Sequence, residues 1–261
     1  MDGVAENREL SRWAEEKRAS LSRAPPPDFG AVGPSRRSLD RVLAGVPGKL
    51  AVIAQPARRS AEEGHLRDDL DVVEFAHACV DAGVAALALG TDRRFGLRPN
   101  EWAPVLAPDF PLPVLHHDLV VSAAQLLDSR RLGADAVWLH LAVLDDPELA
   151  KCVELAKHLE MALVAEGRTP QELSRAVAAG ARIVCASAFD EMGAQNADAA
   201  LELLRGIRRN VLRVVRGPVS GEAGLAALRG EVDALWICGP ASMPRDTYAY
   251  LRPLVEEAAG E

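Results

Sequence analysis

The sequence has no excess of basic residues, and this absence narrows the possible partners. Its 30 lysines and arginines are outnumbered by 38 aspartates and glutamates, which gives a formal net charge of -8. Nucleic-acid-binding domains usually carry a basic face, and the paired arginines of this chain stand among acidic residues. We therefore expect a small-molecule substrate and no nucleic-acid partner.

Paired cysteines and long apolar runs are also missing. The four cysteines stand apart, none in CxxC spacing: Cys79, Cys152, Cys185 and Cys238. Such cysteines are expected to be small buried side chains in a reducing compartment. No apolar run reaches the roughly 18 residues of a transmembrane helix, and the polar start MDGVAENREL is unlike a signal peptide. We expect a cytoplasmic protein with no membrane partner and no cofactor.

The sequence does contain a regular alternation of short apolar runs and amphipathic stretches. From Lys49 onward there are eight apolar runs: LAVIAQ, VAALALG, LPVLHHDLV, DAVWLHLAV, MALVAEG, ARIVCAS, NVLRVVRG and VDALWICG. Between them lie stretches with helical periodicity, such as DVVEFAHACVDAG and TPQELSRAVAAG. Apolar strands that alternate with helices predict a parallel sheet covered by helices.

Glycines mark the ends of the predicted helices. Four of them stand just before an apolar run: Gly83, Gly133, Gly180 and Gly230. Glycine suits the left-handed residue that ends a helix. Eight strands in one series favour a closed (β/α)8 barrel, and no Gly-rich dinucleotide fingerprint follows the first strand. We predict an α/β fold, a single TIM-barrel domain over residues 1–261, with a helical extension at 1–48 whose helices span about 6–22 and 37–44.

Segments along nearly the whole chain resemble the indole-3-glycerol phosphate synthase family of tryptophan biosynthesis. GKLAVIA, LGTDRRFG, PVLHHD, GADAVWL and LVAE stand in the family's order, at strands one to five. The resemblance implies decarboxylative ring closure of an anilino-deoxyribulose phosphate, followed by loss of water. It also implies that a strand-one Glu and Lys, a strand-three Lys and a strand-five Glu transfer protons. An Asn after strand six assists, and backbone amides after strands seven and eight hold the phosphate.

Most of these catalytic positions are replaced here. By the resemblance, Gln55 stands for the strand-one Glu and Ala57 for its Lys. His117 stands for the strand-three Lys, whereas Glu166 keeps the strand-five Glu. A glutamine cannot exchange a proton near neutral pH, and an alanine offers neither charge nor proton. Their loss should slow the family reaction by several powers of ten.

The family's phosphate grip is altered as well. The strand-six Asn pair is replaced by Ala186-Ser187, and the loops after strands seven and eight carry Pro218 and Pro240. Proline has no N–H and cannot donate from an anion site built of backbone amides. Arg58 and Arg59, which follow strand one, could still bind an anion.

Chemically useful residues remain at inward positions. By the resemblance, His117 and Glu166 occupy inward family positions. Every second side chain of a strand points inward, and His140 shares one face of its strand with Trp138. We therefore expect His117, His140 and Glu166 to surround one pocket on three adjacent strands. Imidazole moves protons near pH 7, so histidine and glutamate are the expected acid–base pair. A histidine in an apolar strand can equally be a hydrogen-bonded core residue. No HxH or HxxxH spacing supports a metal site, and no metal is expected.

The pocket is expected to have an aromatic wall. Trp138 shares a strand face with His140, and Phe95 matches an aromatic position that lines the family's pocket. The expected substrate-binding residues are therefore Arg58, Arg59, Phe95, Trp138 and Gln55. His116 and Trp236 are expected to point toward helices.

Three functions stay open on the sequence alone. The first is a repurposed cyclase, lyase or dehydratase acting on a different, non-phosphorylated substrate in specialised biosynthesis. The second is a catalytically inactive binding or scaffold protein, and the third is residual synthase activity in tryptophan biosynthesis. New acid–base residues accompany the losses, which favours the first. An Ala- and Arg-rich composition suggests a GC-rich bacterium, and the chain is compatible with a monomer or a homodimer.

Overall fold

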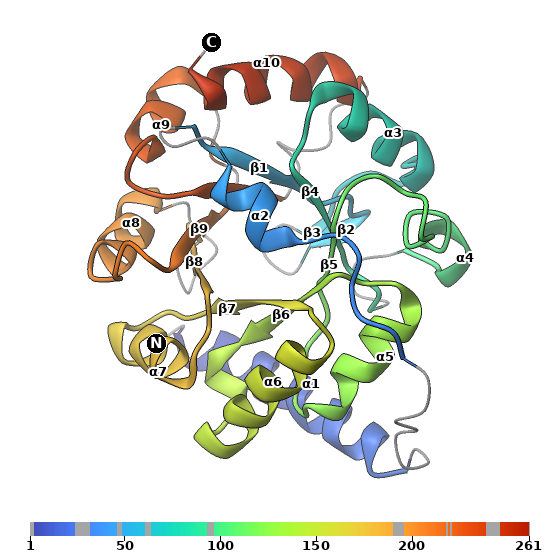
Figure 1. Cartoon of the computed structure of the whole chain (residues 1–261), viewed down its shortest axis with the longest axis vertical. Coiled ribbons are helices and arrows are strands. Elements are labelled where there is room, and N and C mark those ends of the chain that lie inside the picture. Colours follow the sequence, from blue (N-terminus) through green and yellow to red (C-terminus); the bar gives the residue numbers. More distant parts are fainter. Residues whose placement is uncertain are drawn as a thin grey trace.

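The computed structural model is a closed barrel of parallel strands surrounded by helices (Figure 1). It describes residues 3–23, 32–45, 49–60, 64–92, 97–189, 196–217, 219, 221–238 and 246–260. The strands are neighbours in the order β1-β10-β9-β8-β7-β6-β5-β4. Each predicted apolar run forms one of them: β1 (Ala51–Ala54), β4 (Ala86–Leu89), β5 (Val114–His116), β6 (Ala136–His140), β7 (Ala162–Glu166), β8 (Ile183–Ser187), β9 (Leu212–Arg216) and β10 (Ala234–Ile237). The (β/α)8 prediction is confirmed.

Helices connect successive strands and cover the barrel. The longer ones are α3 (Val72–Ala82), α5 (Ala124–Leu132), α6 (Asp146–His158), α7 (Pro170–Ala179), α8 (Ala197–Arg205), α9 (Gly221–Leu228) and α10 (Thr247–Ala259). The shorter elements are α4 (Pro99–Trp102), η2 (Leu141–Val143) and the strand pair β2 (Arg59–Ser60) and β3 (Gly64–His65). Local sequence sets several helix starts: the Asp71 carboxylate accepts hydrogen bonds from the N–H groups of Val73 and Glu74, and Thr169 caps α7.

Gly133 shows why glycine ends these helices. Its φ of 104° lies in the left-handed region, which a residue with a Cβ seldom adopts. A Cβ at this position would also lie 2.2 Å from the carbonyl oxygen of Leu106. Gly83, Gly180 and Gly230 have positive φ angles too, so the predicted role of the recurring glycines is confirmed.

Alternation along the strands separates two apolar layers. On β6, Val137 and Leu139 belong to the outer layer beneath the helices, whereas Ala136 and Trp138 belong to the barrel interior. The same alternation continues on the other strands. Side chains at the last inward position of each strand therefore face the barrel mouth, the end where the C-terminal ends of the strands meet. Active sites of such barrels lie at this end.

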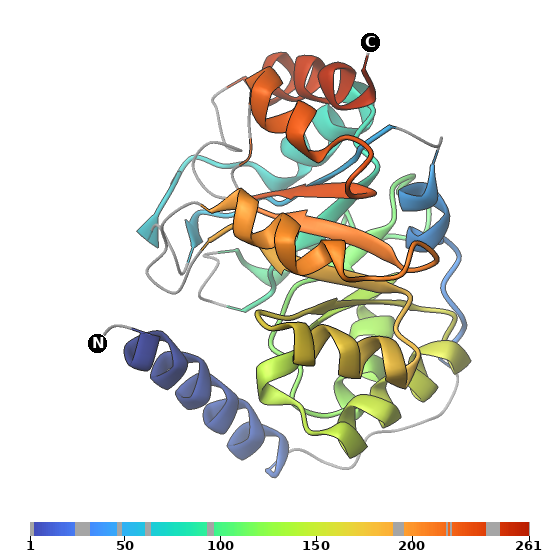
Figure 2. The ribbon, with the colours of Figure 1, turned by 90° about the vertical axis from the view of Figure 1, so that its left-hand side faces the viewer.

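Two helices precede β1 and lie at opposite ends of the barrel (Figure 2). Leu39 and Leu43 of α2 (Leu39–Ala44) are buried in the interior apolar cluster, at the N-terminal ends of the strands. Helix α1 (Gly3–Leu21) lies at the mouth, where Lys17 Nζ is 2.7 Å from Asp118 Oδ2 and 3.4 Å from Asp92 Oδ2. Among the residues that the structure describes, no helix combines the length and apolarity needed to cross a membrane.

Candidate active site

Glu166 is the buried centre of the barrel mouth. It ends β7, has no exposed surface, and faces inward. Its Oε2 accepts hydrogen bonds from Trp138 Nε1 at 2.9 Å and from Arg216 Nε at 2.9 Å. Arg216 Nη2 also donates to Oε1 at 3.2 Å. Two donors from one guanidinium and one from an indole therefore fix the orientation of this carboxylate.

The charge of Arg216 decides the protonation state of Glu166. Burial on its own would raise the pKa of the carboxyl group. The positive charge of Arg216 and the hydrogen bonds from Arg216 and Trp138 outweigh that effect and lower the pKa to about 2. Glu166 is thus a carboxylate at neutral pH, able to accept a proton or stabilise positive charge, with no proton to give.

His117 lies between two tryptophans. Its ring centroid is 4.5 Å from that of Trp138 and 4.9 Å from that of Trp236, and both contacts are edge-on. Burial, followed by the nearby charge of Arg216, lowers the pKa of His117 well below its usual value. The imidazole is therefore neutral at pH 7 and retains one N–H donor and one acceptor nitrogen.

Trp236 points into the barrel, and the expectation that it faces a helix is wrong. It pairs with Ile53 in the register between β1 and β10, and both side chains belong to the interior cluster. Its Nε1 donates to Gln55 Oε1 at 3.0 Å. Gln55 therefore holds an indole at the position where the family resemblance implies an acid.

His140 lies next to Glu166, because the two are partners in the register of β6 and β7. Its ring is 5.5 Å from that of Trp138, and its Nδ1 accepts a 3.4 Å hydrogen bond from the N–H of Ala142. Burial lowers its pKa. An accepting Nδ1 on a neutral ring places the proton on Nε2. The structure thus brings the three expected catalytic residues together at one end of the barrel.

His116 is held away from this cluster, as expected. Its Nε2 is 2.6 Å from Thr91 Oγ1, and its Nδ1 is 2.8 Å from Ser129 Oγ. Ser129 Oγ donates to the carbonyl of Gln125, so it accepts from Nδ1–H of His116. Burial lowers the pKa of His116 to about 4, which suits a neutral structural histidine.

The two expected anion-binding arginines are in different situations. At least four N–H donors of Arg58 are used within the fold, by Glu101 and by the carbonyls of Asp68 and Leu70. Its role as a substrate ligand stays a prediction, and it would require breaking the ion pair with Glu101. Arg59 lies on β2 and is exposed.

Of the two residues that replace the family's strand-six Asn pair, Ser187 faces the pocket and Ala186 does not. Ala186 is buried in the outer layer, whereas Ser187 follows Ile183 and Cys185 on the inward side of β8. Ser187, rather than Ala186, is therefore the strand-six residue nearest the mouth. Ala57, which follows β1, is buried. The remaining expected positions lie outside the described residues: Phe95, Pro218 and Pro240.

Arg216 is a residue of the candidate site that the sequence analysis did not identify. The segment was interpreted only as a replaced phosphate loop, although Leu212, Val214 and Arg216 are successive inward positions of β9. Arg216 contacts Trp236 as well as Glu166: its guanidinium carbon lies 5.7 Å from the centroid of the Trp236 ring. Alternation along β9 was the available signal. No group of three or more potential metal ligands is found in the described part of the chain.

Comparisons with known proteins agree with this architecture. The family described as indole-3-glycerol phosphate synthase matches residues 7–239. The indole-3-glycerol phosphate synthase of Micrococcus luteus is 33% identical over 233 residues, which cover 87% of this chain and 84% of that protein. The protein of the same name from Mycolicibacterium vanbaalenii is 31% identical over 225 residues, or 85% and 78% of the two chains.

Solved structures of other proteins are similar to this chain in fold only. The 3-hexulose-6-phosphate synthase of Salmonella typhimurium superposes with a TM-score of 0.60 at 18% identity, over 80% of this chain and 98% of that chain. The thiamine phosphate pyrophosphorylase of Pyrococcus furiosus gives a TM-score of 0.57 at 15% identity, over 81% and 98%. The family match over residues 7–239 and the relative that is 33% identical over 87% of this chain show that the chain belongs to the indole-3-glycerol phosphate synthase family.

Proposed function

We propose that the chain is a weak indole-3-glycerol phosphate synthase, in which Glu166 and His117 carry out the proton transfers that remain possible. The observation that carries this proposal is the retained carboxylate, fully buried and oriented by Trp138 and Arg216. Identity of 31 to 33% with proteins of that name over most of the chain supports the same reaction. We place the protein in the bacterial cytoplasm as a monomer or homodimer.

The buried groups explain why the reaction would be weak. Glu166 is an ionised base whose pKa of about 2 makes it a poor proton acceptor near pH 7. His117 is neutral, so its N–H is a weak acid that can polarise an oxygen but gives up its proton reluctantly. A positioned acid or base contributes roughly 10² to 10⁴-fold. With the groups at Gln55 and Ala57 both lost, we expect turnover about 10⁴-fold or more below a family member that carries them.

A second candidate is a repurposed cyclase, lyase or dehydratase. Arg216 forms an ion pair with Glu166, and Gln55 accepts a hydrogen bond from Trp236. The mouth therefore combines an ion pair without net charge and the indoles of Trp138 and Trp236. An aromatic lining of this kind suits an aromatic substrate without phosphate, and such a substrate would have to displace the side chains that bury both indoles. His117 and Glu166 would then be the acid–base pair, with His140 beside them and Trp138 as a wall. Arg59 and Phe95 would contact the substrate from the loops, and Arg58 could do so only if released by Glu101.

The family reaction is the test that separates these candidates. Purified protein would be given the anilino-deoxyribulose phosphate, and product would be followed by indole fluorescence. Glu166→Gln should abolish any turnover, because the amide keeps the size of the side chain but cannot accept a proton, and its NH2 group cannot accept from Arg216. Glu154→Gln, on the exposed face of α6, is the matched control and should leave turnover unchanged.

Each outcome decides a different point. Turnover that depends on Glu166 supports the weak synthase. Binding of the substrate without turnover would contradict it and favour a protein that binds the family's ligand without catalysis. If the substrate neither reacts nor binds, the repurposed enzyme becomes the better proposal, and non-phosphorylated aromatic acids become the ligands to screen.

A further inference from the structure

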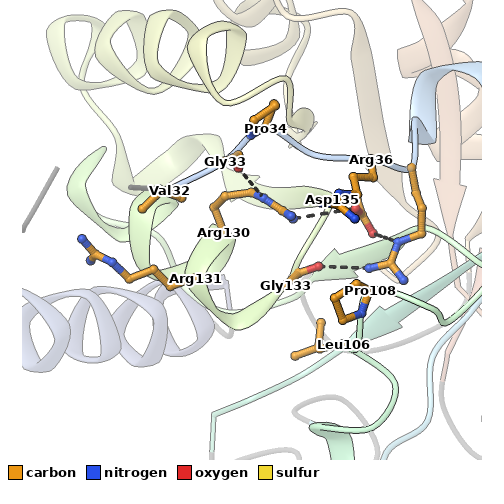
Figure 3. A pocket seen from close by; sticks show the side chains of 11 residues that line it. Val32, Gly33, Pro34, Arg36, Leu106, Pro108, Arg130, Arg131, Gly133 and Asp135 are labelled. Atoms are coloured by element: carbon orange, nitrogen blue, oxygen red, sulfur yellow. Dashed lines mark hydrogen bonds and ion pairs between the residues drawn. The ribbon is translucent and has the colours of Figure 1, made fainter. Parts of the chain in front are cut away.

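A cavity lies at the end of the barrel opposite the mouth. Its volume is about 500 Å³, within the range of small-molecule sites. It is formed by the segment before α2, the chain that leads into β5, and the turn between α5 and β6 (Figure 3). We call it the arginine pocket; its lining includes Arg36, Arg37, Arg130, Arg131 and Asp135. These segments lie at the N-terminal ends of the strands, whereas Glu166 and its neighbours lie at the C-terminal ends. The pocket is therefore separate from the mouth.

The pocket carries a net positive charge. Four arginines and one aspartate line it, so the lining side chains carry a formal charge of +3. Asp135 is already bound: Arg37 Nε lies 2.7 Å from its Oδ2, and Ser35 Oγ donates to Oδ1 at 2.8 Å. The carboxylate can therefore balance Arg37 but has little left for the other guanidinium groups.

The other three arginines differ in how firmly they are held. Arg130 donates to the carbonyls of Gly33 and Ala134, and its Nη1 is 3.8 Å from Asp135 Oδ1. Arg131 pairs with Asp128 at 3.0 Å and extends away from Arg130 in Figure 3. Arg36 is exposed, and within the described residues it has no hydrogen bond or ion pair. A ligand could thus recruit Arg36 without breaking any internal contact.

Electrostatics and lining chemistry agree on the kind of ligand. Partial burial lowers the pKa of Arg130, and the charges of Arg37 and Arg36 lower it further against the opposing effect of Asp135. A bound anion would relieve that repulsion. Leu106 and Pro108 add apolar surface to the same cavity. The positive charge is spread over separate parts of the pocket, which favours more than one acidic group on the ligand.

We propose that the arginine pocket is a binding site for a small multivalent anion, whose carboxylate or phosphate groups pair with Arg36, Arg130 and Arg131. Guanidinium groups suit both kinds of anion because their planar N–H donors match carboxylate and phosphate oxygens. The site is independent of the synthase proposal, because it shares no residue with the mouth and its binding can be measured without turnover.

Isothermal titration calorimetry with pyrophosphate and with citrate tests the proposal and distinguishes phosphate from carboxylate ligands. At constant ionic strength, we expect at least one probe to bind with a dissociation constant below about 1 mM. Arg36→Ala combined with Arg131→Ala should weaken that binding about tenfold or more. The matched control is Arg208→Ala with Arg209→Ala, which removes the same charge from an exposed turn before β9.

The control should stay within about twofold of the wild-type dissociation constant. The proposal is wrong if neither probe binds below about 10 mM. It is also wrong if the control weakens binding as much as the pocket variant, since net charge alone would then explain the affinity. All substituted side chains are exposed or half-exposed, so thermal unfolding should confirm that both variants fold.

Discussion

Each end of the barrel holds an arginine–carboxylate pair, and the two pairs are built differently: both members are buried at the mouth, whereas Arg37 at the other end is partly exposed. At the mouth, Arg216 binds Glu166 through contacts of 2.9 and 3.2 Å. At the opposite end, Arg37 Nε lies 2.7 Å from Asp135 Oδ2. Among the described residues, the hydrogen-bond partners of the Glu166 carboxylate are all side chains that project inward from strands: Arg216, Trp138 and, at 3.8 Å, Cys185 Sγ.

The pair at the N-terminal end is connected to the backbone instead. Asp135 Oδ2 accepts from the N–H of Val114, the first residue of β5. Arg37 donates to the carbonyls of Ala107, Phe110 and Gly133. This pair therefore joins the segment before α2 to the segments that enter β5 and β6, and its removal disturbs the chain path itself.

The difference fits the division of labour in these barrels, where the C-terminal end carries chemistry and the N-terminal end stability. A pair made only of side chains can be exchanged as a unit without moving any backbone. A pair bonded to several carbonyls and an N–H has no simple replacement.

The largest effect is expected from Arg216→Met. It leaves the Glu166 carboxylate fully buried without its counter-charge, which should cost about 3 to 5 kcal/mol of unfolding free energy. Adding Glu166→Gln should restore most of that loss, because a neutral amide needs no counter-charge and still accepts from Trp138. Guanidinium unfolding of both variants measures this. A double variant as unstable as the single one would show that the pair is not an exchangeable unit.

Asp135→Asn tests the other end and should cost slightly less, about 2 to 4 kcal/mol. Here the companion change Arg37→Met should restore little, because Ala107, Phe110 and Gly133 would then lose a donor to their carbonyls. The double-mutant cycle should thus give a smaller recovery than at the mouth. Equal recovery at both ends, measured by the same unfolding method, would remove the distinction drawn between the two pairs.

Acid should weaken the protein through its buried histidines, two of which lie at the mouth. Burial lowers the pKa of His116, His117 and His140, in the case of His116 to about 4. Below about pH 6.5 the unfolded chain therefore binds more protons than the folded chain, and stability falls as pH falls. Each histidine can contribute up to about 1.4 kcal/mol per pH unit.

Unfolding free energies at pH 7.5, 6.5 and 5.5 check this expectation. His117→Asn should reduce the slope, because it removes one of the three buried groups. A wild-type stability that is flat or rises toward pH 5.5 would contradict the assignment of three neutral histidines.

The fold could be predicted because its signals are local and repeated. Eight apolar runs and recurring glycines each report one strand or one turn, and a closed series of parallel strands has few alternatives. Helix ends at Gly83 and Gly180 needed no tertiary information, since a positive φ favours glycine wherever it occurs.

The site was harder because it depends on register between distant strands. Trp236 was expected to face a helix, and only its pairing with Ile53 reveals the inward side of β10. Arg216 was overlooked because its partner Glu166 lies 50 residues earlier in the sequence. The family resemblance predicted that His117 and Glu166 point into the barrel. The charge that keeps Glu166 ionised belongs to Arg216, for which the resemblance gave no role.

The smallest effect is expected from Lys17→Met, which tests how strongly the ion pairs of Lys17 bind α1 to the barrel mouth. Lys17 bridges Asp118 and Asp92, but its side chain is 21% exposed, so the loss should be only about 0.5 to 1 kcal/mol. Hydrogen exchange should show faster exchange of α1 amides with the barrel strands unaffected. Arg12→Met on the same helix, where the ion pair with Glu16 is exposed, should change neither quantity. A loss with Lys17→Met as large as that of Arg216→Met would mean that α1 is part of the barrel's cooperative core rather than a cover over its mouth.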